Sequence, residues 1–388
     1  MDKKTSLDNF AEQKLASIEQ NGLRRVLDTT SRGLAGAAFR REKRLISFCC
    51  NDYLGLSQHP KVRKAAADAI MTFGAGAGAS RLVTGNHPLY ATLEKSLSEI
   101  KRSDSAVVFG SGYLANLGVI PVFAGPEDLC LTDELAHASM HAGLRASCSK
   151  IEYFLHNDLE DCRQKLMEKR GSYRKCLILT EGVFSMDGDR APLQGLCDLA
   201  EEFEAWLFVD DAHGLGVLGD GAGSVAAAGL QKRVHLQMGT LSKSVGSYGG
   251  FLSGSAPVID LLVNRARSLI YETGLPPAAV AASIAALDII RTDNNLVSRP
   301  LRLARGFAES LGLPEAQSAI IPLILGSPES ALQASLDLQQ EGFLVTAIRP
   351  PTVPKGTARL RFTFCANHFE EDVSRLIETI KRLGLAKL

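Results

Sequence analysis

The segment AWLFVDDAH (205–213) is an apolar run that ends in two aspartates and, shortly after them, a histidine. A continuous apolar run of this length is typical of a strand that is buried on both faces of a mainly parallel sheet. In such sheets, ligands bind in the crevice beyond the carboxyl ends of the strands. The segment therefore predicts an α/β fold, and it predicts the edge of the sheet at which a functional site should lie.

Six other apolar runs of the same kind flank this segment, and stretches with helical character separate them. They are SAVVF (105–109), DLCLT (128–132), KIEYF (150–154), CLILT (176–180), VHLQM (234–238) and GGFLSG (249–254). We therefore predict a mainly parallel seven-stranded sheet between helices, in a large domain over 46–290. Residues 1–45 are predicted to form an arm with a helix over 7–22, which the glycine at its end would stop.

The pattern changes from about residue 295 onward. Strands are expected at 319–325, 344–350 and 358–364, with helices at about 329–341 and 369–384. This combination predicts a smaller C-terminal α+β domain over 291–388.

Composition excludes several classes of protein. Of the 388 residues, 45% are hydrophobic and 22% charged, and 43 basic residues balance 43 acidic ones. A chain without a basic surplus is not expected to bind nucleic acid through its charge. Eight cysteines without a C-x-x-C pair suit a reducing cytoplasm, and no metal site is expected. No apolar run approaches the roughly 20 residues that span a bilayer, so we expect a cytoplasmic protein with no membrane contact.

Polar residues end most of the predicted strands, and they include one lysine in a run of small residues. Lys243 lies in GTLSKSVGSYGG (239–250), directly after a predicted strand. Pyridoxal phosphate chemistry requires a lysine for a Schiff base and an aspartate that keeps the pyridine nitrogen protonated. Either Asp210 or Asp211 can face this cofactor, but not both, because adjacent strand residues point in opposite directions. His213 would then hydrogen-bond the phenolic oxygen of the ring.

The phosphate and the flat ring of this cofactor need partners of other kinds. The stretch GSGYLAN (110–116) is a glycine turn that leads into a helix, which is a suitable anion site. Thr240 and Ser242 add hydroxyl groups just before the lysine. His137 supplies a flat side chain for the other face of the ring.

Other motifs fail on spacing. A phosphate-binding P-loop requires glycine immediately before its lysine, but the residue there is Ser242. The glycine pattern GLGVLG (214–219) lacks the acidic residue that a dinucleotide site needs, because none occurs over 221–259. A zinc protease would need glutamate where Ala138 stands, and no serine lies in a G-x-S-x-G motif.

Together, these motifs resemble the α-oxoamine synthase family of fold-type I pyridoxal phosphate enzymes. The resemblance extends from about residue 40 to the end of the chain, with the motifs in the family's order. The stretches that carry it are NDYLGLS (51–57), GAGASRLVTGNHPLYATLE (76–94), HASMHAG (137–143), TEGVFSMDGDRAPL (180–193), VDDAHGLGVLG (209–219), GTLSKSVGSYGG (239–250) and AIRPPTVPKGTARLRFT (347–363).

The resemblance implies a role for each of several catalytic residues. Lys243 would be the Schiff-base lysine, Asp210 would lie at the pyridine nitrogen, and His213 would lie at the phenolic oxygen. His137 would stack on the ring, and Ser185 would lie near the ring's oxygen and the reacting carbonyl.

The resemblance also implies binding residues and a homodimer with sites at the interface. Gly112, Tyr113 and Thr240 would hold the phosphate, and Thr273 would reach the phosphate of the neighbouring subunit. The expected substrate-binding residues are Asn51, Arg24, Arg349, Thr352 and Arg361. Arg349 is either a cation facing the acyl chain or its distal carboxylate, or a solvated arginine at the end of a strand.

The activity implied is a decarboxylating acyl transfer that forms a carbon–carbon bond. The motifs are most similar to those of members that join L-alanine to pimeloyl-CoA or a pimeloyl carrier protein in biotin biosynthesis. Sister reactions of the family remain open, namely glycine with succinyl- or acetyl-CoA and serine with a long acyl-CoA. A dinucleotide-dependent oxidoreductase and a catalytically silent interaction protein are the alternatives from other classes. The absence of an acidic residue over 221–259 argues against the oxidoreductase. The presence of both Lys243 and an aspartate, Asp210 or Asp211, argues against the catalytically silent protein.

Overall fold

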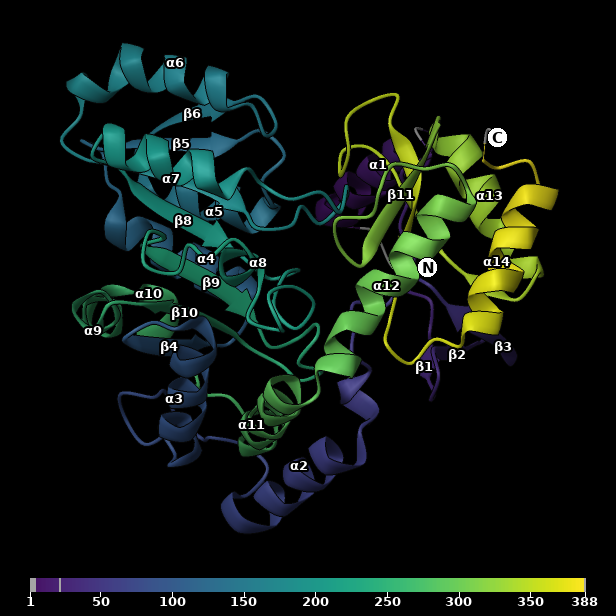
Figure 1. Ribbon diagram of the computed structural model, residues 1–388, viewed down its shortest axis with the longest axis horizontal. Coiled ribbons are helices and arrows are strands. Elements are labelled where there is room, and N and C mark those ends of the chain that lie inside the picture. The colour runs from purple at the N-terminus through teal and green to yellow at the C-terminus, as the bar shows by residue number, and fades with distance from the viewer. Residues whose placement is uncertain (1–4, 21, 387–388) are drawn as a thin grey trace.

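The larger of two units is built on a seven-stranded sheet (Figure 1). The computed structural model describes residues 5–20 and 22–386. The strand order is β4-β10-β9-β8-β7-β5-β6, and only β10 runs antiparallel to its neighbours. The prediction of a mainly parallel seven-stranded sheet is therefore confirmed. The strands are β4 (Ser105–Phe109), β5 (Leu129–Asp133), β6 (Lys150–Phe154), β7 (Cys176–Glu181), β8 (Trp206–Asp210), β9 (Leu236–Thr240) and β10 (Gly250–Gly254).

Helices cover both faces of this sheet, which explains why its strands are continuous apolar runs. In β8, Phe208 packs into the core on one face, whereas Leu207 and Val209 pack into the core on the other. The first face is covered by α4 (Gly112–Phe123), α5 (Ala138–Ser147), α9 (Ala256–Arg265) and α10 (Arg267–Ile270). The second face carries α2 (Pro60–Phe73), α3 (Leu89–Lys101), α6 (Leu159–Lys169), α7 (Leu193–Glu202), α8 (Ser224–Ala227) and α11 (Pro277–Thr292), and the short helices η1 (Leu56–Gln58) and η2 (Arg170–Ser172) lie in connections.

The smaller unit contains an antiparallel sheet with the order β11-β14-β13. Phe307, Leu338, Phe362 and Leu376 are buried in the core between this sheet and its helices. Its elements lie close to the ranges expected from the sequence, except that no helix was expected over 294–310. They are β11 (Ile320–Gly326), β13 (Thr346–Ile348), β14 (Ala358–Thr363), α12 (Asn294–Ser310), α13 (Pro328–Gln340) and α14 (Glu370–Arg382).

A further sheet joins the N-terminal arm to the smaller unit, with the order β1-β2-β3-β12. Its strands are β1 (Ser31–Arg32), β2 (Ala37–Arg40), β3 (Lys43–Ser47) and β12 (Phe343–Leu344). Ile46 and Phe48 therefore pack with the C-terminal core rather than with the large sheet, although the sequence placed residue 46 at the start of the large domain. Local pattern does not reveal which distant strand will pair with β3, and the limits of the domains remain predictions.

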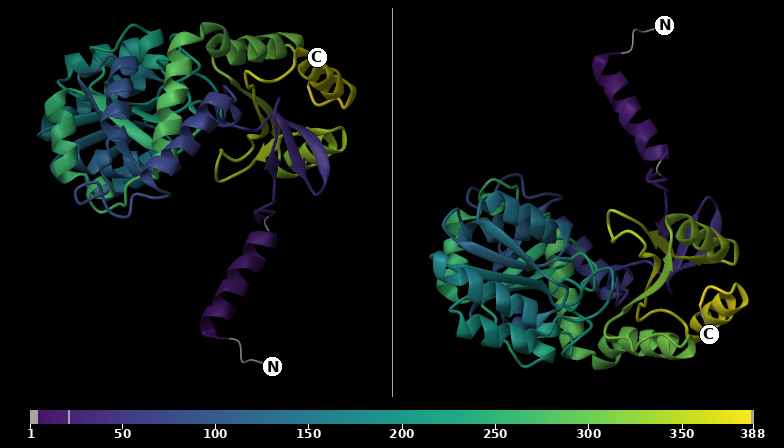
Figure 2. Two further views of the ribbon diagram at one scale, coloured as in Figure 1. Left: turned by 90° about the horizontal axis from the view of Figure 1, so that it is seen from below. Right: turned by 90° about the horizontal axis from the view of Figure 1, so that it is seen from above.

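The first helix, α1 (Ser6–Gln20), extends away from both units in the two views of Figure 2. None of its residues is buried, and Leu7 and Phe10 are 72% and 58% exposed. The helix was expected over 7–22, of which residue 21 lies outside the described part of the chain. In the described part, no helix combines the length and the apolar character required to cross a bilayer.

Candidate active site

The polar ends of the strands meet at one edge of the large sheet, and a pocket opens there toward the smaller unit. The pocket has a volume of about 240 Å³. Its lining residues come from both units. They are Cys49, Asn51, His137, Ser185, Met186, His213, Lys243, Thr346, Ile348 and Arg361.

Lys243 and His213 form the central pair of the pocket. The lysine Nζ lies 2.9 Å from the histidine Nε2. Burial lowers the pKa of Lys243 to about 8, helped by the charge of Arg361, while the charges of Asp210 and Glu181 oppose the shift. An amine with this pKa has a nucleophilic, uncharged fraction near neutral pH, which an ordinary lysine lacks.

His213 is held on its other side by a buried tyrosine. Its Nδ1 lies 2.7 Å from the hydroxyl of Tyr53. Burial, together with the nearby charges of Lys243 and Arg361, lowers the pKa of His213 well below its ordinary value. The ring is therefore neutral, with one donor and one acceptor nitrogen, and Tyr53 orients it toward the lysine.

Asp210 is the last residue of β8 and faces α4 on the first face of the sheet. Its carboxylate accepts hydrogen bonds from Asn116 Nδ2 at 2.8 Å and from the amide of Ala212 at 3.1 Å. Asn116 also donates to Ser139 Oγ at 2.8 Å, and this hydroxyl lies 2.7 Å from His137 Nδ1. A continuous network thus fixes Asp210 and His137 relative to each other.

Asp211 points to the opposite face, as the alternation of side chains along a strand requires. It forms a fully buried ion pair with Lys101 of α3, with Nζ and Oδ2 2.7 Å apart. It also accepts hydrogen bonds from the amide and the hydroxyl of Ser224. Asp211 is therefore compensated inside the protein, and it connects the sheet to α3 and α8.

The start of α4, the expected phosphate site, lies against the end of β9. Ser111 caps the helix by accepting a hydrogen bond from the amide of Leu114 at 3.1 Å, and the amides of Gly112 and Tyr113 come first in the helix. The first amides of a helix have no acceptor within it. A Cβ at Gly112 would lie 3.4 Å from Thr240 Oγ1, so the helix start and the end of β9 are in close contact.

These groups fit pyridoxal phosphate. Among the described residues Asp210 has no ion-pair partner, and a buried carboxylate is compensated when it accepts a hydrogen bond from a pyridinium nitrogen, which keeps its proton. The amides of α4 and the hydroxyls of Thr240 and Ser242, 2.8 Å apart, suit a phosphate. The amine of Lys243 suits the aldehyde.

Arg361 links the pocket to the smaller unit. This buried side chain of β14 donates through Nε to the carbonyl of Ser185 and through Nη1 to Asn51 Oδ1 at 3.1 Å. Its Nη2 lies 3.5 Å from the hydroxyl of Tyr53. Asn51, Ser185 and Arg361, which the sequence placed in the site, are thus brought together.

Eight predicted site residues are not among those that line this pocket. Asp210, Gly112, Tyr113 and Thr240 make the contacts described above, and the other four lie elsewhere. Arg24 lies beyond the end of α1 and forms an ion pair with Glu19 of that helix, with Nη1 and Oε2 3.0 Å apart. Arg349 donates to the carbonyl of Gly22. Thr352 lies in an exposed turn. Thr273 forms a backbone bridge with Ser80, away from the lining residues. Their roles as contacts for substrate or phosphate remain predictions.

Several residues of the site were not assigned from the sequence. Tyr53 lies within a stretch that carried the family resemblance, and Asn116 ends the glycine turn GSGYLAN (110–116), so their positions were marked but not their contacts. Glu181 is buried, accepts from the amide of Ser185 at 3.2 Å, and has its pKa raised well above its ordinary value by burial and by the charge of Asp210. Thr346 and Ile348 come from the smaller unit, within the strand expected over 344–350, and no sequence pattern assigned them to the site.

Comparison with known protein families finds one whose model covers most of the chain. The aminotransferase class I and II family matches residues 43–380. An 8-amino-7-oxononanoate synthase from Methylocella silvestris is 58% identical over 342 residues, which cover 88% of this chain and 97% of that protein. An 8-amino-7-oxononanoate synthase from Beijerinckia indica is 52% identical over 382 residues, with coverage of 98% and 99%.

Comparison with solved structures finds serine palmitoyltransferases and an 8-amino-7-oxononanoate synthase. Serine palmitoyltransferase from Sphingomonas wittichii matches with a TM-score of 0.90 and 30% identity over 100% of both chains. A serine palmitoyltransferase from S. paucimobilis with bound PLP and myriocin matches with a TM-score of 0.90 and 29% identity over 98% of both chains. An 8-amino-7-oxononanoate synthase from Francisella tularensis has a TM-score of 0.75 and 25% identity, over 88% of this chain and 98% of that one.

Proposed function

Because the chain belongs to the aminotransferase class I and II family and has the fold of α-oxoamine synthases that bind pyridoxal phosphate, we propose that it catalyses the 8-amino-7-oxononanoate synthase reaction. In this reaction L-alanine and a pimeloyl thioester form 8-amino-7-oxononanoate, and the free thiol and carbon dioxide leave. The relatives of this name at 52% and 58% identity support the choice of substrates.

Pyridoxal phosphate supplies the electron sink that makes a carbanion at the α-carbon of an amino acid accessible. Asp210, whose carboxylate Asn116 keeps in position, would accept a hydrogen bond from the pyridine nitrogen. His213, oriented by Tyr53, would hold the phenolic side of the ring, and His137 would cover one face. The network from Asp210 to His137 arranges these groups before the substrate binds.

Lys243 is the proton carrier of the reaction. Its Nζ takes a proton from the α-carbon of the amino acid and returns one to the same carbon after carbon dioxide has left. A base is most effective when its pKa lies near the working pH, and burial lowers the pKa of Lys243 to about 8. His213, 2.9 Å from this nitrogen, orients the amine.

The remaining polar groups of the pocket orient the two substrates. The guanidinium of Arg361 has the planar geometry that binds a carboxylate through two hydrogen bonds, and Asn51 lies beside it. Ser185, whose backbone is fixed by Arg361 and Glu181, presents its hydroxyl to the thioester carbonyl. Both units must be in contact for these groups to act together.

The observation that carries this proposal is the pairing of a low-pKa lysine with a neutral histidine beside a buried aspartate. A steady-state assay with a panel of amino acids and acyl thioesters tests it. We expect the highest kcat/KM with L-alanine and pimeloyl-CoA or a pimeloyl carrier protein. Slower turnover of glycine is expected, since one methyl group is worth about 1–3 kcal/mol of discrimination.

A sister activity is the second candidate, because the solved structures with a TM-score of 0.90 are serine palmitoyltransferases. Higher kcat/KM with serine and a long acyl-CoA, or with glycine and succinyl- or acetyl-CoA, would replace the proposed substrates. The assignment of Lys243 and Asp210 would be unaffected by that result.

The proposal includes a homodimer with sites at its interface. Tyr113 and Tyr271 are 49% and 74% exposed close to the phosphate site, as expected of residues that a second copy covers. An active monomer in sedimentation would contradict this part. The cytoplasmic location is also proposed, and it is supported by eight cysteines that are all free thiols.

A further inference from the structure

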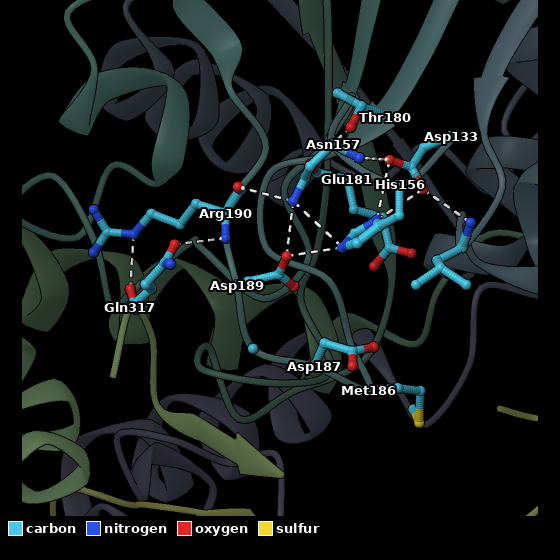
Figure 3. A network of polar contacts seen from close by, with 12 residues as sticks. Asp133, His156, Asn157, Thr180, Glu181, Met186, Asp187, Asp189, Arg190 and Gln317 are labelled. Carbon is cyan, nitrogen blue, oxygen red and sulfur yellow. Dashed lines mark hydrogen bonds and ion pairs between the residues drawn. The ribbon is translucent and has the colours of Figure 1, made fainter. Parts of the chain in front are cut away.

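A second polar cluster lies at the same edge of the large sheet, and none of the reacting groups above belongs to it (Figure 3). His156 follows β6 and joins two carboxylates. Its Nδ1 lies 3.0 and 3.1 Å from the two oxygens of Asp133, and its Nε2 lies 2.8 Å from Asp189 Oδ2. Asn157 donates to the same carboxylates, at 2.9 and 2.7 Å. We call these four residues the His156 clasp.

The contacts of His156 require a charged ring. Both ring nitrogens face carboxylate oxygens, which only accept hydrogen bonds, so both must carry a proton. Burial opposes the charge, but the hydrogen bonds and negative charges of Asp133 and Asp189 outweigh it and raise the pKa of His156 to about 10. The clasp is therefore an ion-paired contact at neutral pH.

The clasp holds one side of a tight turn, residues 184–189. The amide of Phe184 donates to the carbonyl of Asp189 at 3.0 Å, and the amide of Gly188 donates to the carbonyl of Phe184 at 2.8 Å. The ring of Phe184 packs edge-on against His156, with centroids 4.4 Å apart. The same turn carries Ser185 and Met186, which line the pocket.

The smaller unit holds the opposite side of this turn. Ser318 donates to the carbonyl of Gly188 at 2.7 Å, and Arg359 pairs with Asp187. Gly188 has φ of 74°, and a Cβ there would lie 2.2 Å from the carbonyl oxygen of Ile320. The turn is thus held between two units, and the clasp attaches it to the large sheet together with the hydrogen bond from the amide of Ser185 to Glu181.

We propose that His156 is a positioning residue, which joins Asp133 to Asp189 and thereby holds turn 184–189 so that Ser185 and Met186 keep their places in the pocket. This inference rests on the proposed function, because it concerns the alignment of the thioester with Ser185. A shift of about 1 Å in a group that orients a substrate can lower the rate by about 100-fold. Of the groups expected to hold pyridoxal phosphate, Ser185 lies on the turn, whereas Asp210, Lys243 and the expected phosphate site do not, so we expect the cofactor to depend on the turn much less than the thioester does.

The test compares His156→Gln, Asp189→Asn and the double variant with the native holoenzyme. We expect kcat/KM for the thioester to fall by about 10- to 100-fold in each single variant, with the Kd for pyridoxal phosphate changed by less than about threefold. The double variant should lose no more than the worse single variant, because the two side chains act through one contact. Asp189→Asn keeps the size of the side chain and so covers the case in which His156→Gln does not fold.

Asp128→Asn is the matched control. This buried carboxylate at the other end of β5 accepts from the amide of Gly125 at 2.9 Å and pairs with Lys175 at 3.2 Å, far from the turn in the sequence and on the opposite edge of the sheet. It should lower stability without changing kcat/KM for the thioester. A loss of kcat/KM in this control equal to that in His156→Gln would overturn the proposal.

Hydrogen exchange of the backbone amides over 184–190 provides a readout without turnover. We expect about tenfold faster exchange in His156→Gln and no change in Asp128→Asn. Unchanged exchange over 184–190 in His156→Gln overturns the proposal, and so does a loss of activity that an equal loss of pyridoxal phosphate affinity explains. If the native protein instead fails to use a pimeloyl thioester, the proposed function fails while the exchange experiment still decides the role of His156.

Discussion

Two histidines at the same edge of one sheet have opposite protonation. His213, in the pocket, has its pKa lowered well below the ordinary value, because it is buried near Lys243 and Arg361. His156, in the clasp, has its pKa raised to about 10, because the two carboxylates that it contacts outweigh its burial. Both histidines follow a strand at the same edge of the sheet, and the charges of the neighbouring side chains decide which ring carries a proton.

The protonation state of each histidine suits a different role at this edge of the sheet. A neutral ring beside a low-pKa amine suits the exchange of protons, whereas a charged ring between carboxylates suits the attachment of a turn. The pocket and the clasp meet at turn 184–189. Ser185 and Met186 of this turn line the pocket, and Asp189 of the same turn contacts His156.

The largest effect is expected at the centre of the pocket. Lys243→Ala should lower turnover by several orders of magnitude, since the amine that carries the proton is lost. The variant should keep part of its affinity for pyridoxal phosphate through the contacts at α4. Borohydride reduction of the native protein, followed by peptide mapping, should label Lys243. A label on another lysine, or a protein that binds no pyridoxal phosphate, would contradict the assignment.

Asp210→Asn should cause the next largest loss. Removing the charge opposite the pyridine nitrogen should lower kcat by about 10²- to 10³-fold, as for other preorganised electrostatic contacts. The affinity for pyridoxal phosphate should weaken as well, while the thermal transition of the cofactor-free protein stays close to that of the native chain. Steady-state kinetics and absorbance titration measure these quantities. Normal kcat in this variant would remove Asp210 from the mechanism.

The adjacent Asp211→Ala should act on stability instead. It leaves the ammonium of Lys101 buried and unpaired, which typically costs about 3–5 kcal/mol of unfolding free energy. Denaturant unfolding of the cofactor-free protein should show this loss. If Asp211→Ala were stable but bound pyridoxal phosphate more weakly than Asp210→Asn, the two aspartates would have to exchange roles.

A pH dependence should follow from the amine of the pocket. Burial lowers the pKa of Lys243 to about 8, so the uncharged amine of the cofactor-free protein increases as pH rises toward 8 and is nearly complete above it. The rate of combination with pyridoxal phosphate should rise about tenfold per pH unit below 8 and then level off. Stopped-flow absorbance measures this rate. A rate that continues to rise to pH 10 would show an ordinary lysine.

The protonation of His156 and His213 can be observed in the native protein without any substitution. Nitrogen NMR of labelled imidazole rings should show both nitrogens of His156 protonated at pH 7.5 and the ring of His213 neutral. His156 should lose its proton only as pH approaches about 10. Loss of that proton near pH 6.5 would show that the two carboxylates do not hold it, and the comparison of the two regions would no longer apply.

Local patterns were sufficient for much of the fold and for the centre of the site. The seven apolar runs predicted the strands of the large sheet, because a strand buried on both faces must be apolar along its whole length. The polar residues at and after the ends of β8 and β9 predicted His213, Lys243 and one of two aspartates at one edge, since parallel strands end on the same side, and the family resemblance selected Asp210. The family resemblance marked Asn51, Ser185 and Arg361, and the structure brings these residues to the same pocket.

Tertiary structure alone decided the contacts between distant segments. Three such contacts cannot be predicted from a periodic pattern. They are the pairing of β3 with β12, the hydrogen bond between Tyr53 and His213, 160 residues apart, and the attachment of turn 184–189 to His156. Arg24 and Arg349, by contrast, were expected in the site but lie near α1, outside the pocket. A strand's apolar period depends on its own residues, whereas hydrogen bonds and ion pairs between segments depend on how the packed units bring the side chains together.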